Sequence, residues 1–315
     1  MAASDLISEL LSGMRLCGVQ FRRLRMRAGG GIAFTNELGR GQFHFVARGP
    51  VWLHGPGGDV HCLESGDAVL LPRGGQHAIL AAPKVGSDAI QAFDLNLPAD
   101  EQPADPQAAI LFSCCMQLQL GGMQPLVAAM PAVMRVDTLL DCSPEIRPLL
   151  EAMERESLLL LVGHGGILAR LAEVVAALIV RGWVTGSGGE AGGWLGALHD
   201  PRLSKALLAM HRHPERPWTV ASLASEAGQS RSVFAQRFLH ALGLAPLRYL
   251  TDLRMRLAMQ HLSDEPASVE RVAEALGYGS LAAFSRAFKR SVGVSPGAVK
   301  RRAGLPARAG QERQV

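Results

Sequence analysis

The sequence predicts an α+β, multidomain protein: an N-terminal β-barrel, a helical linker and a C-terminal all-α domain with two helix-turn-helix units. Three observations predict this fold class. Short β-like runs separated by Gly, Pro and Asp fill residues 20–120, a wide apolar helical stripe follows, and one fourteen-residue pattern occurs twice near the end. We therefore expect three parts, which span residues 1–135, 136–211 and 212–305.

The expected strands of the first part are short and are bounded by turn residues. They are "QFHFVARG", "PVWLHG", "DVHCL", "DAVLLPRG", "DAIQAFDL" and "ILFSCCMQLQL". Regularly spaced short strands with turn signals between them are typical of a small antiparallel barrel or sandwich.

The middle part, residues 143–211, is expected to be helical. From Ile167 to Ile179, apolar residues recur at helical spacing and form a wide stripe. Two interpretations stay open, because the stripe either packs against the chain's own barrel or pairs with a second subunit. We expect a homodimer formed through this region.

The last part contains the repeated pattern, with its two copies fifty residues apart. "VFAQRFLHALGLAP" (233–246) and "AFSRAFKRSVGVSP" (283–296) both read Phe-x3-Phe-x4-Gly-x2-Pro. Two Phe residues at i and i+4 lie on one helical face, Gly ends a helix, and Pro beyond it prevents continuation. Each copy is therefore predicted to be an amphipathic helix with a defined end.

Each of these helices is preceded by a shorter one. The expected N-caps and turn glycines are Thr219, Gly228 and Ser230 in the first copy, and Ser268, Gly277 and Ser280 in the second. A helix, a turn containing Gly and a second helix form the helix-turn-helix arrangement. The sequence thus predicts two such units.

A helix of this kind fits the major groove of B-DNA, where residues on its outer face reach base edges. With the Phe pairs pointing inward, the outward positions are Arg231, Ser232, Ala235 and Gln236, and then Leu281, Ala282, Ser285 and Arg286. By their chemistry, Arg286 suits guanine and Gln236 suits adenine. The expected phosphate contacts are Arg231, Arg237, Lys289 and Arg290.

Charge is distributed unevenly along the chain. From Arg212 onward there are 16 basic and 8 acidic residues, whereas the preceding residues hold 16 basic and 20 acidic ones. A basic end on an acidic body favours a polyanionic partner. Arg248, Arg254 and Arg256 fall on the helix expected to join the two units, and we expect the apolar residues of that helix to fix the spacing of the units.

The last part resembles the DNA-binding domain of the AraC/XylS family of bacterial transcription regulators. The matching stretches are "VAEALGYGSLAAFSRAFKRSVGVSP" and "WTVASLASEAGQSRSVFAQRFLHALGLAP", between His213 and Arg302. The resemblance implies seven helices, binding to two successive major-groove segments of double-stranded promoter DNA, and activation through RNA polymerase. This chain has Gln236 where the family often has Arg, so the family's base preference is not carried over to the first unit.

The first part resembles the cupin superfamily. "GDAVLLPRGGQH" (66–77) is similar to the second cupin motif, and "FHFVARGPVWLH" is similar in placement to the first. Such cupin-like domains are the usual front end of AraC-like regulators, so the resemblance implies a cupin-like sensor of a small molecule, a metal or an oxidant.

Three possibilities stay open for this barrel, and a bound divalent metal is the first of them. His44 and His77 are kept where cupins have metal ligands, but Phe45 and Val46 occupy positions where a second ligand is expected in the first motif. Two ligands are too few for a metal site, and Cys17 could complete a Cys-His-His set. The barrel could instead bind an organic ligand, or it could form a bare sensory pocket. Finally, Cys17 could sense oxidants, since it lies beside basic residues that favour the thiolate.

A cupin-type metalloenzyme with a DNA-binding tail would be a different class of protein. It would need the metal ligands that the first motif lacks, so we predict no catalytic residues. The sequence has no export signal and no uninterrupted apolar span, and its five cysteines have no disulfide-like spacing. We therefore predict a cytoplasmic protein with no membrane partner, and the resemblance to the AraC/XylS family implies that it is a transcription activator.

Overall fold

The computed structural model describes residues 6–8, 11, 14–35, 39–93, 105, 107–120, 124–136, 143–159, 161–186, 193–264 and 267–303. The chain forms two compact units. The sheet unit comprises Met14–Leu120 and Pro125–Gly188, and the helical unit comprises Met1–Gly13, Gly121–Gln124 and Gly189–Val315. The boundaries expected near residues 135 and 211 stay predictions.

The sheet unit contains two five-stranded sheets. In spatial order, the first sheet consists of β1 (Arg15–Met26), β9 (Ala109–Gln119), β3 (Gly41–Arg48), β6 (Ala68–Leu71) and β10 (Met134–Arg135). The second consists of β5 (Val60–Leu63), β4 (Val51–His54), β7 (His77–Leu80), β2 (Gly31–Phe34) and β8 (Ile90–Ala92). Neighbouring strands are antiparallel except β2 and β8, which run parallel.

The expected strand runs correspond to β3, β4, β5, β6, β8 and β9; none of them covers β2, β7 or β10, or the longest missed strand, β1. This strand has 12 residues, and its register with β9 shifts between Cys17 and Gln20. Four of its residues are arginines, so the alternation of apolar and polar side chains that marks a half-buried strand is obscured.

The space between the sheets is filled by apolar side chains. The fully buried members of this core include Val46, Leu53, Leu63, Leu71, Ile79 and Leu111. They come from β3, β4, β5, β6, β7 and β9, so the core is made by both sheets, as in a barrel or sandwich. This is the predicted N-terminal architecture.

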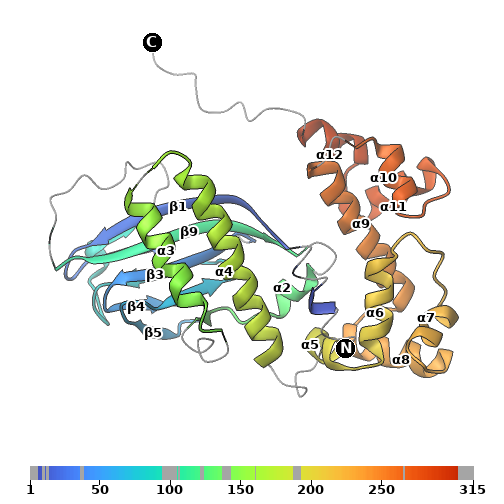
Figure 1. The fold of residues 1–315 in the computed structure, drawn as a ribbon, viewed down its shortest axis with the longest axis horizontal. Helices are drawn as coiled ribbons and strands as arrows, with labels where there is room; N and C mark the ends of the chain where they lie inside the picture. Colours follow the sequence, from blue (N-terminus) through green and yellow to red (C-terminus); the bar gives the residue numbers. More distant parts are fainter. Residues whose placement is uncertain are drawn as a thin grey trace, which may run out of the picture. The chain divides into compact units, whose positions relative to one another are not determined.

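Three α-helices complete the described part of the sheet unit, and the shortest of them is α2 (Pro125–Ala129). α3 (Ile146–Leu159) and α4 (His164–Gly186) pack against each other, and α4 also lies against β1 (Figure 1). The backbone N–H of Leu16 in β1 donates a hydrogen bond to Glu173 Oε1 on α4 at 3.2 Å. None of the helices in the described part of the chain has the length and hydropathy that a membrane span requires.

The helical unit is the predicted all-α part. From residue 193 onward, its helices in the described part of the chain are α5 (Gly193–His199), α6 (Leu203–Arg212), α7 (Val220–Glu226), α8 (Arg231–Leu242), α9 (Pro246–Asp264), α10 (Val269–Ala275), α11 (Leu281–Val292) and α12 (Pro296–Ala303). α7 and α8 form the first helix-turn-helix unit, α10 and α11 form the second, and α9 joins them (Figure 1).

Candidate functional sites

The helix α8 has the start, the stop and the buried face that its sequence predicts. The Ser230 hydroxyl accepts a hydrogen bond from the backbone N–H of Val233, and Gly243 ends the helix in the left-handed region at φ 71°. Phe234 and Phe238 are fully buried, with ring centroids 5.5 Å apart. The opposite face is therefore left to solvent: among the predicted contacts, Arg231, Ser232 and Gln236 are exposed and Ala235 is partly buried.

The helix α11 repeats this arrangement. Ser280 accepts from the backbone N–H of Ala283 at 3.2 Å, and Gly293 ends the helix at φ 84°. Phe284 and Phe288 are fully buried, 5.7 Å apart. On the other face, Leu281, Ala282, Arg286, Lys289 and Arg290 are exposed and Ser285 is partly buried.

Arg237, one of the predicted phosphate contacts, forms an ion pair within the helical unit. Its Nη2 lies 3.0 Å from Asp200 Oδ2. Asp200 precedes α6, and its other oxygen accepts hydrogen bonds from the backbone N–H groups of Arg202 and Leu203. The carboxylate therefore joins the start of α6 to α8.

The three arginines of α9 have different surroundings. Arg248 forms an exposed i,i+4 pair with Asp252 at 3.2 Å. Arg256 lies over the ring of the buried Tyr249, 5.8 Å from its centroid. Arg254 donates hydrogen bonds to two backbone carbonyl groups about 40 residues earlier in the chain. Sequence analysis missed the structural roles of Arg254 and Arg256, since their partners are not visible in the local sequence pattern.

Inside the sheet unit, the two predicted histidines meet. The Nε2 atoms of His44 on β3 and His77 on β7 lie 2.9 Å apart. His44 Nδ1 is 2.8 Å from Ser113 Oγ, and His77 Nδ1 is 2.8 Å from the Gly75 carbonyl oxygen. The Phe34 ring stacks on His77 at 4.8 Å. All of these polar side chains are buried, which is unusual enough to require a chemical explanation.

The hydrogen bonds determine which atom of each pair carries the proton. A carbonyl oxygen can only accept, so His77 Nδ1 carries a proton and donates to Gly75. In neutral His77 the Nε2 atom is then an acceptor, so His44 Nε2 must donate to it. His44 Nδ1 in turn accepts from the Ser113 hydroxyl. With both rings neutral, every ring nitrogen in the chain is satisfied.

The surroundings of the two imidazoles favour these neutral forms. Burial lowers the pKa of His44 well below its usual range, and the neighbouring His77 lowers it further. Burial also lowers the pKa of His77, although its hydrogen bond to Gly75 acts in the opposite direction. The net effect keeps the pair uncharged near neutral pH.

This pair does not fit a metal centre. Its two Nε2 atoms share one proton, and metal sites in proteins usually have at least three protein ligands. Within the described ranges, no group of three His, Cys, Asp or Glu side chains could hold a metal ion. Cys17 pairs with Gln117, four residues along β9 from Ser113, which is about 13 Å at strand spacing. The structure therefore brings His44 and His77 together and leaves Cys17 apart from them.

Three of the cysteines, Cys62, Cys114 and Cys115, offer little reactive thiolate. None of the four in the described part of the chain forms a disulfide, and Cys142 lies outside the described residues. Burial raises the pKa of both Cys114 and Cys115. Partial desolvation and the neighbouring Glu64 raise the pKa of Cys62. A thiol with a raised pKa is a poor nucleophile at neutral pH.

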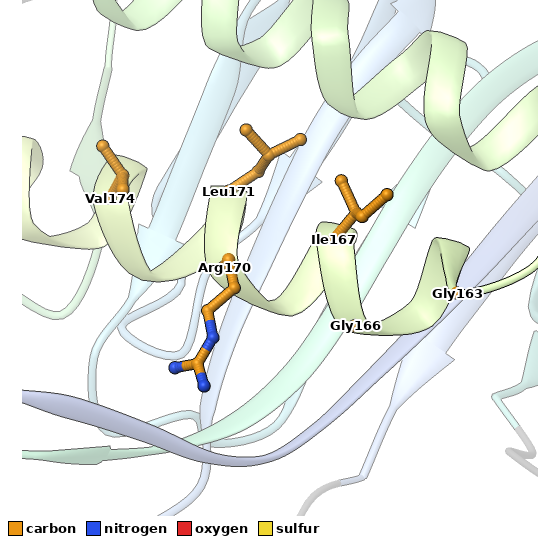
Figure 2. Close-up of a pocket in the computed structure, with 6 residues that line it drawn as sticks. All are labelled: Gly163, Gly166, Ile167, Arg170, Leu171 and Val174. Atoms are coloured by element: carbon orange, nitrogen blue, oxygen red, sulfur yellow. The ribbon is translucent and has the colours of Figure 1, made fainter.

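The helix α4 presents apolar side chains on two faces. Leu168, Val175 and Ile179 are buried within the sheet unit, as the first interpretation of the stripe predicts. A second row, Ile167, Leu171, Val174 and Leu178, has the 4-3-4 spacing of a coiled-coil contact, and Ile167 and Val174 are each 47% exposed. Figure 2 shows Ile167, Leu171 and Val174 projecting from one side of α4, beside a groove that begins at Gly163 and Gly166.

Comparisons with known proteins match both units. Residues 5–185 match the Cupin family, and residues 223–302 match the helix-turn-helix domain family. The regulator AlkR of Acinetobacter baylyi is 30% identical over 261 residues, which cover 80% of this chain and 85% of AlkR. RclR of Escherichia coli, named as an RCS-specific transcriptional activator, is 29% identical over 271 residues, 85% of this chain and 87% of RclR. An AraC-like regulator of Streptomyces lividans is 45% identical over 114 residues, 36% of this chain and 38% of that protein.

The two units and these relatives define a DNA-binding transcription regulator that binds promoter DNA. More specifically, the chain belongs to the AraC family of transcription regulators and carries a cupin domain in front of its double helix-turn-helix. This confirms the resemblance and the fold class identified in the sequence. AlkR, RclR and the Streptomyces protein are all named as transcription regulators, so the metalloenzyme interpretation has no support.

Proposed function

We propose that this regulator reads two successive major-groove segments of promoter DNA with α8 and α11. The supporting observation is the matched pair of capped helices whose Phe pairs are buried and whose outer faces are exposed. The proposed base-contacting positions are Arg231, Ser232, Ala235 and Gln236 on α8, and Leu281, Ala282, Ser285 and Arg286 on α11. The proposed phosphate contacts are Arg231, Lys289 and Arg290, and we assign Arg237 a supporting role through Asp200.

Footprinting at several salt concentrations tests this proposal. Target duplexes would be selected from a random library with the full chain. We expect two protected segments about one helical turn apart, and an observed binding constant that falls steeply with salt because counterions are released from the contacted phosphates. A single protected segment, or binding without salt dependence, would contradict it.

We propose that the cupin domain senses a small molecule through its buried polar groups. Gln42 is fully buried two residues from His44 on β3. Its side chain meets the Cys115 thiol, and neither of its amide atoms has another hydrogen-bond partner among the described residues. A ligand with both donor and acceptor groups would satisfy Gln42 and could replace the bond between Ser113 and His44. Such a ligand would stabilise one arrangement of the sheet unit. Because ligand binding and DNA binding would be thermodynamically linked, the affinity for DNA would then change.

Metal and oxidant are the competing signals, and both can be tested directly. We expect wild-type protein purified without oxygen or chelator to contain no stoichiometric metal. The His44→Ala/His77→Ala double variant should therefore have the same metal content as the wild type. One metal ion per wild-type chain, absent from the double variant, would overturn the small-molecule proposal. For the oxidant, we expect Cys17→Ser to leave the DNA-binding response to hypochlorite or peroxide unchanged.

We also propose that the protein acts as a homodimer formed through the outer row of α4. The row has coiled-coil spacing, and Ile167 and Val174 are half exposed in a single chain. Sedimentation should show a dimer for the wild type and a monomer for Ile167→Lys/Val174→Lys. A dimeric double variant would place the interface elsewhere.

We further propose that the protein is cytoplasmic and activates transcription by contacting RNA polymerase. The relative RclR is named as an activator, which supports this sign of regulation. Transcription in vitro from a selected promoter should rise when the full chain is added with polymerase. A fall in transcript level would indicate a repressor.

A further inference from the structure

The two helix-turn-helix units contact each other at a second place besides the helix α9. The contact joins residues 214–216, which lead into α7 of the first unit, to the turn between α10 and α11 of the second unit. It is made by Arg254, Tyr278 and Gly277 together with the carbonyl groups of Pro214, Glu215 and Arg216. We call this group of contacts the interlock.

Arg254 is the centre of the interlock. It projects from the middle of α9, where its Nε donates to the Pro214 carbonyl at 2.6 Å and its Nη2 donates to the Arg216 carbonyl at 2.8 Å. Its guanidinium also lies over the ring of Tyr278, 5.7 Å from the centroid. One half-buried cation thus holds backbone of the first unit on one side and an aromatic ring of the second unit on the other.

Gly277 brings the two units into direct backbone contact. Its φ is 75°, and a Cβ atom at this position would lie 2.0 Å from the Glu215 carbonyl oxygen. No side chain fits there without moving one unit away from the other. Gly277 is therefore required both as the turn residue of its own unit and as the contact point with the other.

Both sides of the interlock are themselves held in place. On the first side, the Trp218 Nε1–H donates to the His213 carbonyl at 2.8 Å, and the Arg216 guanidinium lies 4.8 Å from the Trp218 ring centroid. On the second side, Tyr278 packs edge-on against the buried Phe284, with ring centroids 5.4 Å apart. Each side of the interlock is therefore fixed within its own unit, and a movement of one unit relative to the other would break the contacts of Arg254.

We propose that Arg254 is a positioning residue that sets the separation and relative rotation of the two recognition helices, so that the protein selects for the spacing of its two DNA half-sites. This inference rests on the proposed function of α8 and α11. The helix α9 alone, with 19 residues and a length of about 28 Å, leaves each unit free to tilt on its own end. The interlock removes that freedom, because it ties the units together across α9.

Spacing selectivity can be measured with a series of duplexes. A site selected with the full chain would be compared with versions in which one or two base pairs are inserted between the two protected segments. Each inserted base pair adds about 3.4 Å and about a tenth of a turn, so only one unit can remain in register. We expect the wild type to lose affinity by about tenfold or more at the first insertion, the size of one lost bidentate base contact.

The variant Arg254→Gln should relax this selectivity. It should bind the original site somewhat more weakly, by about fivefold, but lose only about threefold more on insertion of one base pair, because its two units can adjust independently. Arg248→Gln is the matched control, since it removes the same charge from the same helix and leaves the interlock intact. The control should show the full wild-type penalty for insertion.

Duplexes that carry only one half-site separate positioning from folding. Arg254→Gln should bind each single half-site as the wild type does, which would show that both units remain folded. If Arg254→Gln keeps the full insertion penalty, or if the wild type tolerates insertions, the proposal is wrong. Failure of the wild type to bind any selected duplex would instead refute the proposed DNA-binding function.

Discussion

In the first helix-turn-helix unit the second helix, α8, is supported by polar side chains, whereas in the second unit the second helix, α11, is supported by apolar ones. Three residues after the first Phe of each pair, the first unit has Arg237 paired with Asp200, and the second has the buried Ala287. Three residues after the Pro of each pattern, the first unit has Tyr249 and the second has Val299. Positions that are equivalent in the sequence repeat thus have different chemistry.

The polar support of the first unit is a small, partly buried network. His211 Nε2 lies 2.6 Å from the Tyr249 hydroxyl, and Arg256 lies over the Tyr249 ring. The second unit instead packs Phe284, Ala287, Phe288 and Val299 into one apolar cluster. The two copies therefore share a backbone arrangement and a Phe pair, but their supporting contacts differ. A change of charge should disturb the first unit most, whereas a change of side-chain volume should disturb the second unit most.

The largest effect should come from removing the phenylalanine that each unit has at the first position of its Phe pair. Phe284→Ala should lower the free energy of unfolding of the second unit by about 3–5 kcal/mol, because a fully buried ring is replaced by a cavity. Amide hydrogen exchange of the full chain should show lost protection in α10–α12. Phe234→Ala should do the same for α7 and α8, and equal losses throughout the helical unit after either change would mean that the two units unfold as one.

Acid should separate the two kinds of support. Burial, with help from Arg256, lowers the pKa of His211 to about 3, against about 6.5 in an unfolded chain. Below pH 6.5 the unfolded chain binds one more proton than the folded one, so stability present above that pH is lost as pH falls toward 3. The first unit should lose about 2 kcal/mol by pH 5.

Urea unfolding of the wild type and of His211→Gln at pH 7 and pH 5 measures this loss. His211→Gln removes the titrating group, so its stability should change less between the two pH values. An identical pH dependence in the two proteins would show that other groups cause the effect.

DNA contacts should differ in kind between the two recognition helices. Arg286→Ala should weaken specific binding by about 1–3 kcal/mol and relax the preference at one base position, because guanine offers arginine a bidentate partner. Gln236→Ala should relax a different position, in the segment read by the first unit. Lys289→Ala is the control, since loss of a phosphate contact should weaken binding to all sequences alike and reduce the salt slope by about 1.

The smallest effect should be that of Arg237. Its guanidinium is paired with Asp200, so Arg237→Ala should change DNA affinity by less than about 1 kcal/mol and leave the salt slope unchanged. The exposed Arg290→Ala in the second unit should reduce the slope by about 0.9. If Arg237→Ala does reduce the salt slope, Arg237 contacts phosphate. The first unit would then resemble the second in its phosphate contacts.

Local signals explain how much of the helical unit could be predicted from the sequence. Thr219, Ser230, Ser268 and Ser280 cap their helices by bonds to backbone three residues ahead, so both partners lie within one short window of sequence. The pairing of Arg254 with residues 214 and 216 has no such local signal. An arginine on a helix is expected to face solvent or DNA, and only the tertiary structure shows that this one is half buried.

The sheet unit shows the same limit. Six of the strands are predictable from their Gly, Pro and Asp boundaries, but β1 is not, because its arginines obscure the alternation. The four-residue strands β2 and β7 are also absent from the expected runs. Motif positions alone select His44 and His77, and the structure brings them into contact. Cys17 enters a ligand set on sequence grounds alone, and the strand register places it too far along the sheet.

The polar support of α8 also determines where this regulator can be divided. Trp194 of α5 lies 5.5 Å from the Tyr249 ring, and Asp200 holds Arg237, so part of the first unit's foundation precedes its own helix-turn-helix. A fragment that begins at residue 212 would lose both of these contacts. A chimera that grafts this DNA-binding unit onto a foreign sensor should therefore be joined before Gly193.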